Sequence, residues 1–381
     1  MYPRSWLLLA SVTLALTGCQ TAPATGVQRL AYVGNQGSGP DAGVVAVKLD
    51  EASGALTSLG VVAQVERPTW VLADKVHKRL FAVSEVGNDG TGHGSVLSFT
   101  YDEFSGALTP GERADSGGGG PTHLALAPGG VAVFVANYGS GTVAAVSVDA
   151  GGRLATETGS VAAHEGAGPH RRQKGPHAHG VTLDPSGQYL LSPDLGTDRV
   201  YVYKLGRGSD MLTPATPPFV ALPPGSGPRH IVFAPNGRQA FLMTEMGGTV
   251  FSYAWDARKG ALTELAHAAL DAADFTGAPS GSELAVSRDG RFLYAGNRAA
   301  NRIQVYSVAS DGELRLLQAI DCGGLVPWSF ALNGSGRWLV VANQGSNNLS
   351  VFAVDSASGL LTATDKRLDL GKPTSVAFTD R

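Results

Sequence analysis

Four residues of this chain carry side chains that could perform acid–base chemistry on an anionic substrate. His179 and Glu245 could accept and donate a proton, and Arg229 and Arg298 could bind a negative charge. They fall in successive copies of a pattern that recurs along the chain. We predict that these four residues are catalytic, in a reaction that activates water without a covalent intermediate.

Five further residues are predicted to contact the substrate, because they occupy comparable positions in the pattern: His177, His123, His230, Asp194 and Glu283. Structural explanations stay open for several residues of both sets. An ion pair between Arg229 and Glu245 could simply join two strands. His123 and His230 could line a wall or hold neighbouring copies of the pattern together.

A metal site is one alternative for the two neighbouring histidines. His177 and His179 are two positions apart, so their side chains would share one face of a β-strand. Such a pair can bind a metal ion, but the sequence offers no third ligand at a convincing spacing. We therefore expect no metal and no cofactor.

The chain lacks the motifs of several other enzyme classes. It has no G-x-S-x-G nucleophile elbow, no phosphate-binding P-loop and no H-E-x-x-H metalloprotease motif. Its formal net charge is -3, so there is no basic surplus that would bind a polyanion. We expect no nucleic-acid partner.

An internal repeat supplies the elements that must position these residues. Each copy has an alternating apolar run, a turn, a second run that ends in a polar residue, a Gly/Ser turn and a third run. A weaker fourth run follows in most copies. The polar residue that ends the second run recurs at intervals of about fifty residues: Asn35, Glu85, Asn137, Asp194, Glu245, Asn297 and Asn343. For the asparagines at 35, 137 and 343 we expect only turn capping.

Four short strands per copy, with period-2 alternation and Gly-containing turns, are typical of a β-propeller blade. We predict an all-β fold, a seven-bladed β-propeller with four antiparallel strands per blade. The first copy lacks its first strand, and Pro373–Phe378 offers one at the far end of the chain. We expect this strand to pair into the first blade and close the ring, which makes residues 28–381 one domain.

The blade geometry predicts where the polar side chains meet. In an antiparallel blade, the start of the first strand and the end of the second lie at the same end of the sheet. The candidate residues of the fourth, fifth and sixth copies should therefore line one mouth of a central channel. The basic segment His164–Lys174 lies between the third and fourth copies, and we expect a solvated loop that could overhang this mouth.

The N-terminus has the pattern of an export signal. Arg4 precedes a short apolar run, and Leu16-Thr17-Gly18-Cys19 follows it. This ending resembles a bacterial lipoprotein box, so residues 1–19 are predicted to be a lipoprotein signal with Cys19 lipidated and residues 20–27 a flexible tether. The protein would be lipid-anchored in the periplasm or cell envelope, at the outer membrane if the cell has two. An ordinary signal peptide is the alternative. Cys322 is predicted to be buried.

Three segments carry a family resemblance: GPHAHGVTLDPSGQYLLSPDLGTDRVYVYKL, GSGPRHIVFAPNGRQAFLMTEMGGTVFSYAWD and SELAVSRDGRFLYAGNRAANRIQVYSV. They resemble consecutive blades of the propeller-type lactonases, which include bacterial 6-phosphogluconolactonases and fungal carboxymuconate cyclases. The resemblance covers the chain after the tether and implies active-site roles for His179, Arg229, Glu245 and Arg298. It implies that Glu245 or His179 activates a water that attacks the lactone carbonyl. The arginines would hold the anionic group and stabilise the oxyanion.

Two positions depart from that family. Ala285 stands where several members have histidine, and Trp328 follows Pro327 where many have arginine. These departures and the predicted export favour a small-molecule lactone other than a cytoplasmic phosphorylated sugar. We expect a monomer. Two alternatives stay open, namely a non-catalytic envelope propeller that binds a ligand or protein, and a cyclase that makes lactones with the same residues.

Overall fold

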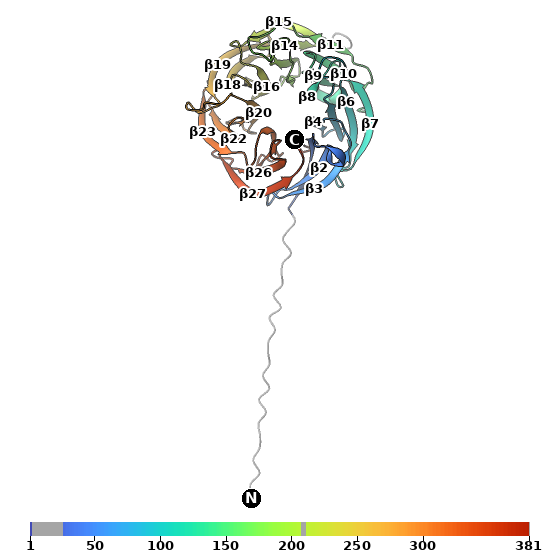
Figure 1. Cartoon of the computed structure of the whole chain (residues 1–381), viewed down its shortest axis with the longest axis vertical. Coiled ribbons are helices and arrows are strands. Elements are labelled where there is room, and N and C mark those ends of the chain that lie inside the picture. The colour runs from blue at the N-terminus through green and yellow to red at the C-terminus, as the bar shows by residue number, and fades with distance from the viewer. Residues whose placement is uncertain (2–25, 207–210, 381) are drawn as a thin grey trace.

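The computed structural model describes residue 1, residues 26–206 and residues 211–380 of the 381-residue chain. Within these ranges, strands β1 to β28 form seven four-stranded sheets arranged as a ring around a central axis (Figure 1). The strands of each sheet pair antiparallel, and the helical elements of the described ranges are two 3₁₀ turns, η1 (Gly39–Asp41) and η2 (Pro128–Gly130). The predicted all-β, seven-bladed propeller is confirmed.

The first four blades, each written from the innermost strand outward, have the following strands. Blade 1 comprises β28 (Pro373–Phe378), β1 (Gln28–Asn35), β2 (Gly43–Asp50) and β3 (Leu56–Ala63); blade 2 comprises β4 (Val71–Asp74), β5 (Arg79–Ser84), β6 (Ser95–Tyr101) and β7 (Leu108–Asp115); blade 3 comprises β8 (Pro121–Leu126), β9 (Ala132–Asn137), β10 (Thr142–Ser147) and β11 (Ser160–Ala163); blade 4 comprises β12 (Thr182–Leu183), β13 (Tyr189–Asp194), β14 (Arg199–Leu205) and β15 (Leu212–Ala221).

The last three blades follow the same order. Blade 5 comprises β16 (Pro228–Phe233), β17 (Gln239–Thr244), β18 (Thr249–Asp256) and β19 (Ala261–Ala269); blade 6 comprises β20 (Gly281–Val286), β21 (Phe292–Asn297), β22 (Arg302–Val308) and β23 (Leu314–Asp321); blade 7 comprises β24 (Pro327–Leu332), β25 (Trp338–Asn343), β26 (Asn348–Val354) and β27 (Leu361–Asp369).

The ring closes as the sequence predicts. The C-terminal strand β28 pairs antiparallel with β1, with Val33 opposite Val376. Thr374 also donates its hydroxyl to the carbonyl of Gly34 at 3.1 Å, which joins both ends of the chain. In Figure 1 the C-terminus accordingly lies among the inner strands, beside β4. Blade 1 therefore leaves no unpaired inner edge.

The core lies between neighbouring blades rather than within any one sheet. All six residues of each of the second strands β13, β17 and β21 are buried, whereas most of the outer strand β27 alternates between partly buried and exposed residues. One cluster, for example, packs Tyr294 of blade 6 against Phe330 of blade 7. Because both faces of each sheet are covered, the inner strands are held in fixed positions around the axis. Cys322 is buried in this cluster, as predicted.

The inner strands carry bulges at the end that bears the site. In blade 5, Pro228 is opposite Thr244 and His230 is opposite Met243, so Arg229 has no partner in the ladder. The same irregularity leaves Trp328 unpaired in blade 7. A bulge re-aims the side chain of its extra residue. The strand register alone would not predict where the side chains of Arg229 and Trp328 point.

The inner strand of blade 4 is much shorter than its sequence suggests. Between β11 and β12, the described backbone makes only an isolated bridge from Ala178 to Asp194. His177 and His179 flank this bridge, so they belong to a loop and not to a regular strand. Residues 164–181, called the site loop below, run from the outer edge of blade 3 to the channel mouth.

No helix within the described ranges is long and apolar enough to cross a membrane. Residues 2–19 of the predicted signal segment 1–19, Cys19 among them, lie outside the described residues, as does the greater part of the predicted tether 20–27.

Candidate active site

The centre of the candidate site is the carboxylate of Glu245, the residue that follows β17. Its side chain is 7% exposed. Its backbone amide donates to the carbonyl of Gly227 at 2.7 Å, and its carbonyl accepts from the amide of Gly281 at 3.0 Å. The backbone of Glu245 thus spans from the start of its own inner strand to that of blade 6. This fixes the carboxylate at the channel mouth.

Three arginines surround this carboxylate, each from a different part of the chain. Arg298 Nη2 lies 2.8 Å from Oε2, and Arg229 Nε lies 3.2 Å from the same oxygen. Arg172 Nη1, from the site loop, lies 2.5 Å from Oε1. One negative charge therefore faces three positive charges in a largely buried site.

Backbone carbonyls hold two of the arginines in place. Arg229 Nη1 donates to the carbonyl of Ser282 at 2.7 Å, and Arg298 Nη2 donates to that of Gly281 at 3.0 Å. The ring of Trp328 lies 4.9 Å from the guanidinium carbon of Arg298 and 5.9 Å from that of Arg229. Trp328 thus packs its aromatic face against two arginines.

His179 stands beside the same carboxylate. Its Nε2 lies 3.7 Å from Glu245 Oε2, too far for a direct hydrogen bond. Its Nδ1 is buried and has no hydrogen-bond partner among the described residues. The ring meets that of Tyr138 edge to face, with 5.5 Å between the centroids. His179 is therefore placed by packing, and its ring nitrogens are not consumed by a structural hydrogen bond.

Burial and charge set opposite protonation states for these two neighbours. Burial raises the pKa of Glu245, but the surrounding charges, with Arg298 foremost, outweigh it and hold that pKa well below its usual value. Burial, followed by the charge of Arg229, lowers the pKa of His179 well below its usual value. At neutral pH the site therefore contains an ionised carboxylate and a neutral imidazole.

The two remaining groups at the mouth are Tyr138 and His177. Their rings stack with 4.5 Å between centroids, and His177 Nδ1 donates to the backbone carbonyl of Tyr138 at 2.8 Å. The hydroxyl of Tyr138 accepts from Arg172 Nη2 at 3.0 Å. His177 is half-buried, which leaves its outer edge facing the mouth.

His230 and Glu283 form a layer beneath Arg229. His230 Nδ1 lies 3.0 Å from Glu283 Oε1, and Ser329 donates to Oε2 at 3.1 Å. His123 packs against Trp70 next to them, with 4.1 Å between the ring centroids. These residues border a cavity of about 340 Å³ in the channel. We propose that they hold Arg229 and join blades, in place of the substrate contact first predicted for them.

Asp194 also has a structural environment. Its side chain is fully buried, Oδ2 lies 2.6 Å from His164 Nδ1, and Oδ1 accepts the backbone amides of His177, Gly196 and Thr197. No oxygen of this carboxylate remains for a ligand. We therefore propose that Asp194 shapes the site loop and does not contact the substrate. Of the asparagines predicted to cap turns, Asn35 accepts the amide of Gly37 in its own turn at 2.7 Å. The side-chain amides of Asn137 and Asn343 donate to the carbonyls of Ser116 and Cys322 in the preceding connections.

Arg172, Tyr138 and Trp328 were not among the predicted site residues. In the sequence Arg172 is part of a basic loop, and a loop of this length has no strand register that would predict where its side chains point. Tyr138 directly follows Asn137 at the end of a second strand, so the repeat itself could have pointed to it. Trp328 occupies the bulge position of blade 7 that Arg229 occupies in blade 5.

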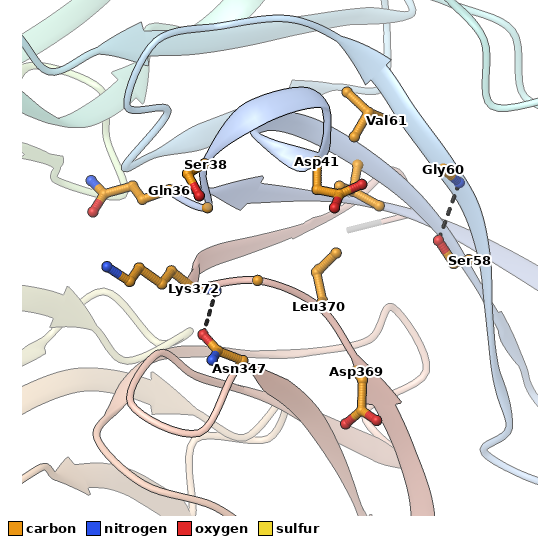
Figure 2. A pocket seen from close by; sticks show the side chains of 13 residues that line it. Gln36, Ser38, Asp41, Ser58, Gly60, Val61, Asn347, Asp369, Leu370 and Lys372 are labelled. Atoms are coloured by element: carbon orange, nitrogen blue, oxygen red, sulfur yellow. Dashed lines mark hydrogen bonds between the residues drawn. The ribbon is translucent and has the colours of Figure 1, made fainter.

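A second, separate cavity lies at the seam where the ring closes. It has a volume of about 660 Å³ and is lined by residues such as Gln36, Asp41, Asn347 and Lys372 (Figure 2). None of the predicted site residues borders it. Among the described residues, no group of three or more histidines, cysteines and carboxylates could hold a metal ion.

A seven-bladed propeller with a charged cluster at one mouth of its channel is the class that fold and site define together. The family model described as "Lactonase, 7-bladed beta-propeller" matches residues 30–378, almost the whole described propeller. The chain belongs to this family of propeller lactonases.

Individual relatives agree with this membership. The chain is 33% identical to the 6-phosphogluconolactonase of Bacillus subtilis over 350 residues, which cover 92% of this chain and 98% of that protein. It is 32% identical over 257 residues to the 6-phosphogluconolactonase of Serratia proteamaculans, covering 67% and 73% of the two chains. Among solved structures, the periplasmic gluconolactonase of Pseudomonas aeruginosa is 34% identical with a TM-score of 0.86, over 92% of this chain and 99% of that one.

Proposed function

We propose that this protein is a lactone hydrolase that opens a sugar-acid or related lactone with an activated water. The observation that carries the proposal is the pairing of a neutral, buried His179 with an ionised Glu245 that three arginines surround. This combination supplies a base, a fixed negative charge beside it and a positive field for an oxyanion. The activities named for the Bacillus subtilis and Pseudomonas aeruginosa relatives support it.

The proposed reaction begins when His179 Nε2 accepts a proton from a water. The oxygen of that water bonds to the lactone carbonyl carbon, and the negative charge on the carbonyl oxygen is stabilised by Arg298 and Arg229. The ring carbon–oxygen bond then breaks, and the imidazolium returns the proton to the leaving alkoxide. The products are the open hydroxy acid and the free site, so atoms and protons balance.

Glu245 has a different role in this proposal. A carboxylate whose pKa is held far below its usual value is a weak base, so it is poorly suited to activating water. Its fixed charge 3.7 Å from His179 Nε2 stabilises the imidazolium that forms during the reaction. Of the two bases implied by the family resemblance, the electrostatics favour His179.

A screen for turnover tests the proposal. The purified chain is assayed with a pH indicator against glucono-1,5-lactone, 6-phosphogluconolactone and aliphatic lactones. We expect hydrolysis of at least one sugar lactone, and a loss of at least about a hundredfold in kcat/KM for Arg229→Ala. Arg238→Ala is the matched control, because Arg238 is an exposed arginine of the same blade. Absence of turnover on every lactone would favour the non-catalytic alternative.

We further propose that the protein is exported and anchored through Cys19. The proposal rests on the predicted lipoprotein signal, and the relative from Pseudomonas aeruginosa is named as periplasmic. Cell fractionation of the chain and of Cys19→Ala tests it. The parent should sediment with membranes and take up labelled fatty acid, whereas the variant should do neither. Equal distribution of both proteins would contradict the anchor.

A further inference from the structure

The site holds more positive charge than its own carboxylates balance. Among the described residues, Glu245 is the one acid that forms ion pairs with Arg172, Arg229 and Arg298. The next carboxylate inward, Glu283, pairs with His230 instead, and burial raises its pKa, which favours its neutral form. The buried Nε of Arg298 has no hydrogen-bond partner among the described residues. Because more guanidinium groups than carboxylates lie in this largely buried part of the channel mouth, the site favours an anionic ligand.

A pocket adjoins this positive region, because Arg172 also lines it. It has a volume of about 550 Å³, with His170, Arg171 and Arg172 on one side and Gly225, Met246 and Pro279 on the other. Arg172 lines the pocket and also contacts Glu245, so the pocket lies next to the proposed reaction centre. Arg171 is exposed and makes no ion pair within the described residues. Two adjacent arginines can thus reach a group bound there.

The two walls of this pocket are tied to each other. The buried amide of Gln173 donates to Asp198 Oδ1 at 2.8 Å, and the carboxylate of Asp198 accepts the backbone amides of Gly225 at 2.6 Å and Gly227 at 2.8 Å. Gln173 Oε1 also accepts the amide of His170 at 3.0 Å. The loop that carries the arginines is therefore pre-organised against the opposite wall, which lowers the cost of binding a ligand between them.

Arg172 is the arginine best placed to exchange partners. Its side chain is 39% exposed, compared with 9% for Arg298 and 2% for Arg229. If it turns toward a ligand, Glu245 Oε2 keeps its contacts with the other two arginines. The exchange therefore does not leave the buried carboxylate without a counter-charge.

We propose that this pocket binds an anionic substituent of the lactone substrate, a carboxylate or a phosphate at the carbon remote from the reacting carbonyl, and that Arg172 and Arg171 determine this specificity. The inference rests on the proposed function for the identity of the substrate, but the pocket can be tested without turnover.

Binding of three open-chain acids tests the proposal. Gluconate, glucarate and 6-phosphogluconate carry a hydroxyl, a carboxylate and a phosphate at the same terminal carbon, and calorimetry with the full chain measures their affinities. We expect glucarate or 6-phosphogluconate to bind at least about tenfold more tightly than gluconate, the gain of a charge-assisted hydrogen bond. The acid with the larger gain identifies the preferred anion. Equal affinities, or no binding of any acid, would overturn the proposal.

Single variants test whether Arg171 and Arg172 cause the tighter binding of acids with a terminal anion. Arg172→Ala and Arg171→Ala should each lower the ratio of terminal-anion to gluconate affinity severalfold. Lys174→Ala, which removes the same charge from an exposed residue of the loop outside the pocket, should leave the ratio unchanged. Since Arg171 makes no hydrogen bond among the described residues, its loss leaves the loop anchors intact. A ratio that survives both arginine variants, or one that falls equally in the lysine variant, would overturn the pocket assignment. Absence of lactone turnover alone would count only against the proposed function.

Discussion

Arg298 Nη2 lies 2.8 Å from Glu245 Oε2, and this contact joins blade 6 to blade 5 at the channel mouth. The same carboxylate also holds Arg172, which approaches from the site loop ahead of blade 4. Three segments that are far apart in the chain therefore share one counter-charge. Glu245 is consequently expected to matter for stability as well as for the proposed reaction.

Glu245→Gln should weaken both properties. Loss of the charge leaves the buried guanidinium groups of Arg229 and Arg298 uncompensated, which costs about 3–5 kcal/mol. The melting temperature should fall by several degrees, and kcat/KM on a lactone substrate should fall at least about a hundredfold. Added phosphate should restore more stability to the variant than to the parent, because it supplies the missing negative charge.

Glu264→Gln provides the comparison, since Glu264 is an exposed carboxylate on β19 of the same blade. Its melting temperature should match that of the parent in both buffers. A Glu245→Gln protein that melts like the parent would contradict the shared counter-charge.

Removal of the His179 imidazole tests its role as base. His179→Ala should lower kcat by about a hundredfold or more, because general base catalysis contributes on that scale. Since burial lowers its pKa, the wild-type rate should stay level as the pH falls through 6.5 and decline only at lower pH. The measurement is the pH dependence of kcat/KM, with the exposed His267→Ala as the control. A decline centred at 6.5 would contradict a buried neutral base.

The repeat predicted the fold because it depends on a simple periodic property. Alternation of apolar side chains and turn residues defines the strands, and the position of Pro373–Phe378 predicts how the ring closes. The same periodicity placed Glu245 and Arg298 at one mouth, because both follow second strands. Antiparallel geometry thus accounts for these two residues, whereas His179 reaches the same mouth from the site loop, next to the isolated bridge of Ala178 with Asp194.

The other parts of the candidate site depend on structural features that the sequence repeat does not encode. Arg229 and Trp328 are aimed by bulges, which appear only as a missing partner in the strand register. Arg172 reaches the site because Gln173 is buried against Asp198 across the loop. Asp194 ends its strand as Glu245 does, yet nearby backbone amides and His164 occupy its oxygens. Equivalent positions in a repeat thus do not have equivalent roles.

Thr374→Val tests the closure of the ring. The hydroxyl of Thr374 is buried and contacts the carbonyls of Gly34 at 3.1 Å and Pro68 at 3.3 Å, so it links blades 1 and 2. Valine has a similar shape but no donor, and the buried carbonyls would lose this partner at a cost of about 1–3 kcal/mol. Urea unfolding measures the change. Thr362→Val, at an exposed position of β27, should be neutral, and a neutral Thr374→Val would argue against a stabilising closure contact.

Three buried histidines predict how stability depends on pH. Burial, with smaller contributions from neighbouring charges, lowers the pKa values of His123, His179 and His230 below 6.5. As the pH falls below 6.5, the unfolded chain takes up protons that the folded chain refuses, so the free energy of unfolding decreases. Glu283 opposes this trend, because burial raises its pKa and the folded chain then binds a proton more readily. Because three histidines lower the free energy of unfolding as the pH falls and one carboxyl raises it, the protein should be less stable at pH 5.5 than at pH 7.5.

His123→Phe isolates one of these groups. Phenylalanine can keep the ring packing on Trp70, while it removes one titrating site from the channel. The slope of unfolding free energy against pH between 7 and 5.5 should decrease by up to about 1.4 kcal/mol per pH unit, the value for one proton. Urea titrations followed by tryptophan fluorescence at several pH values give this slope, and His267→Phe, on an exposed surface, should not change it. An unchanged slope in His123→Phe would mean that His123 is already protonated in the folded protein at pH 5.5, because burial alone then fails to keep it neutral.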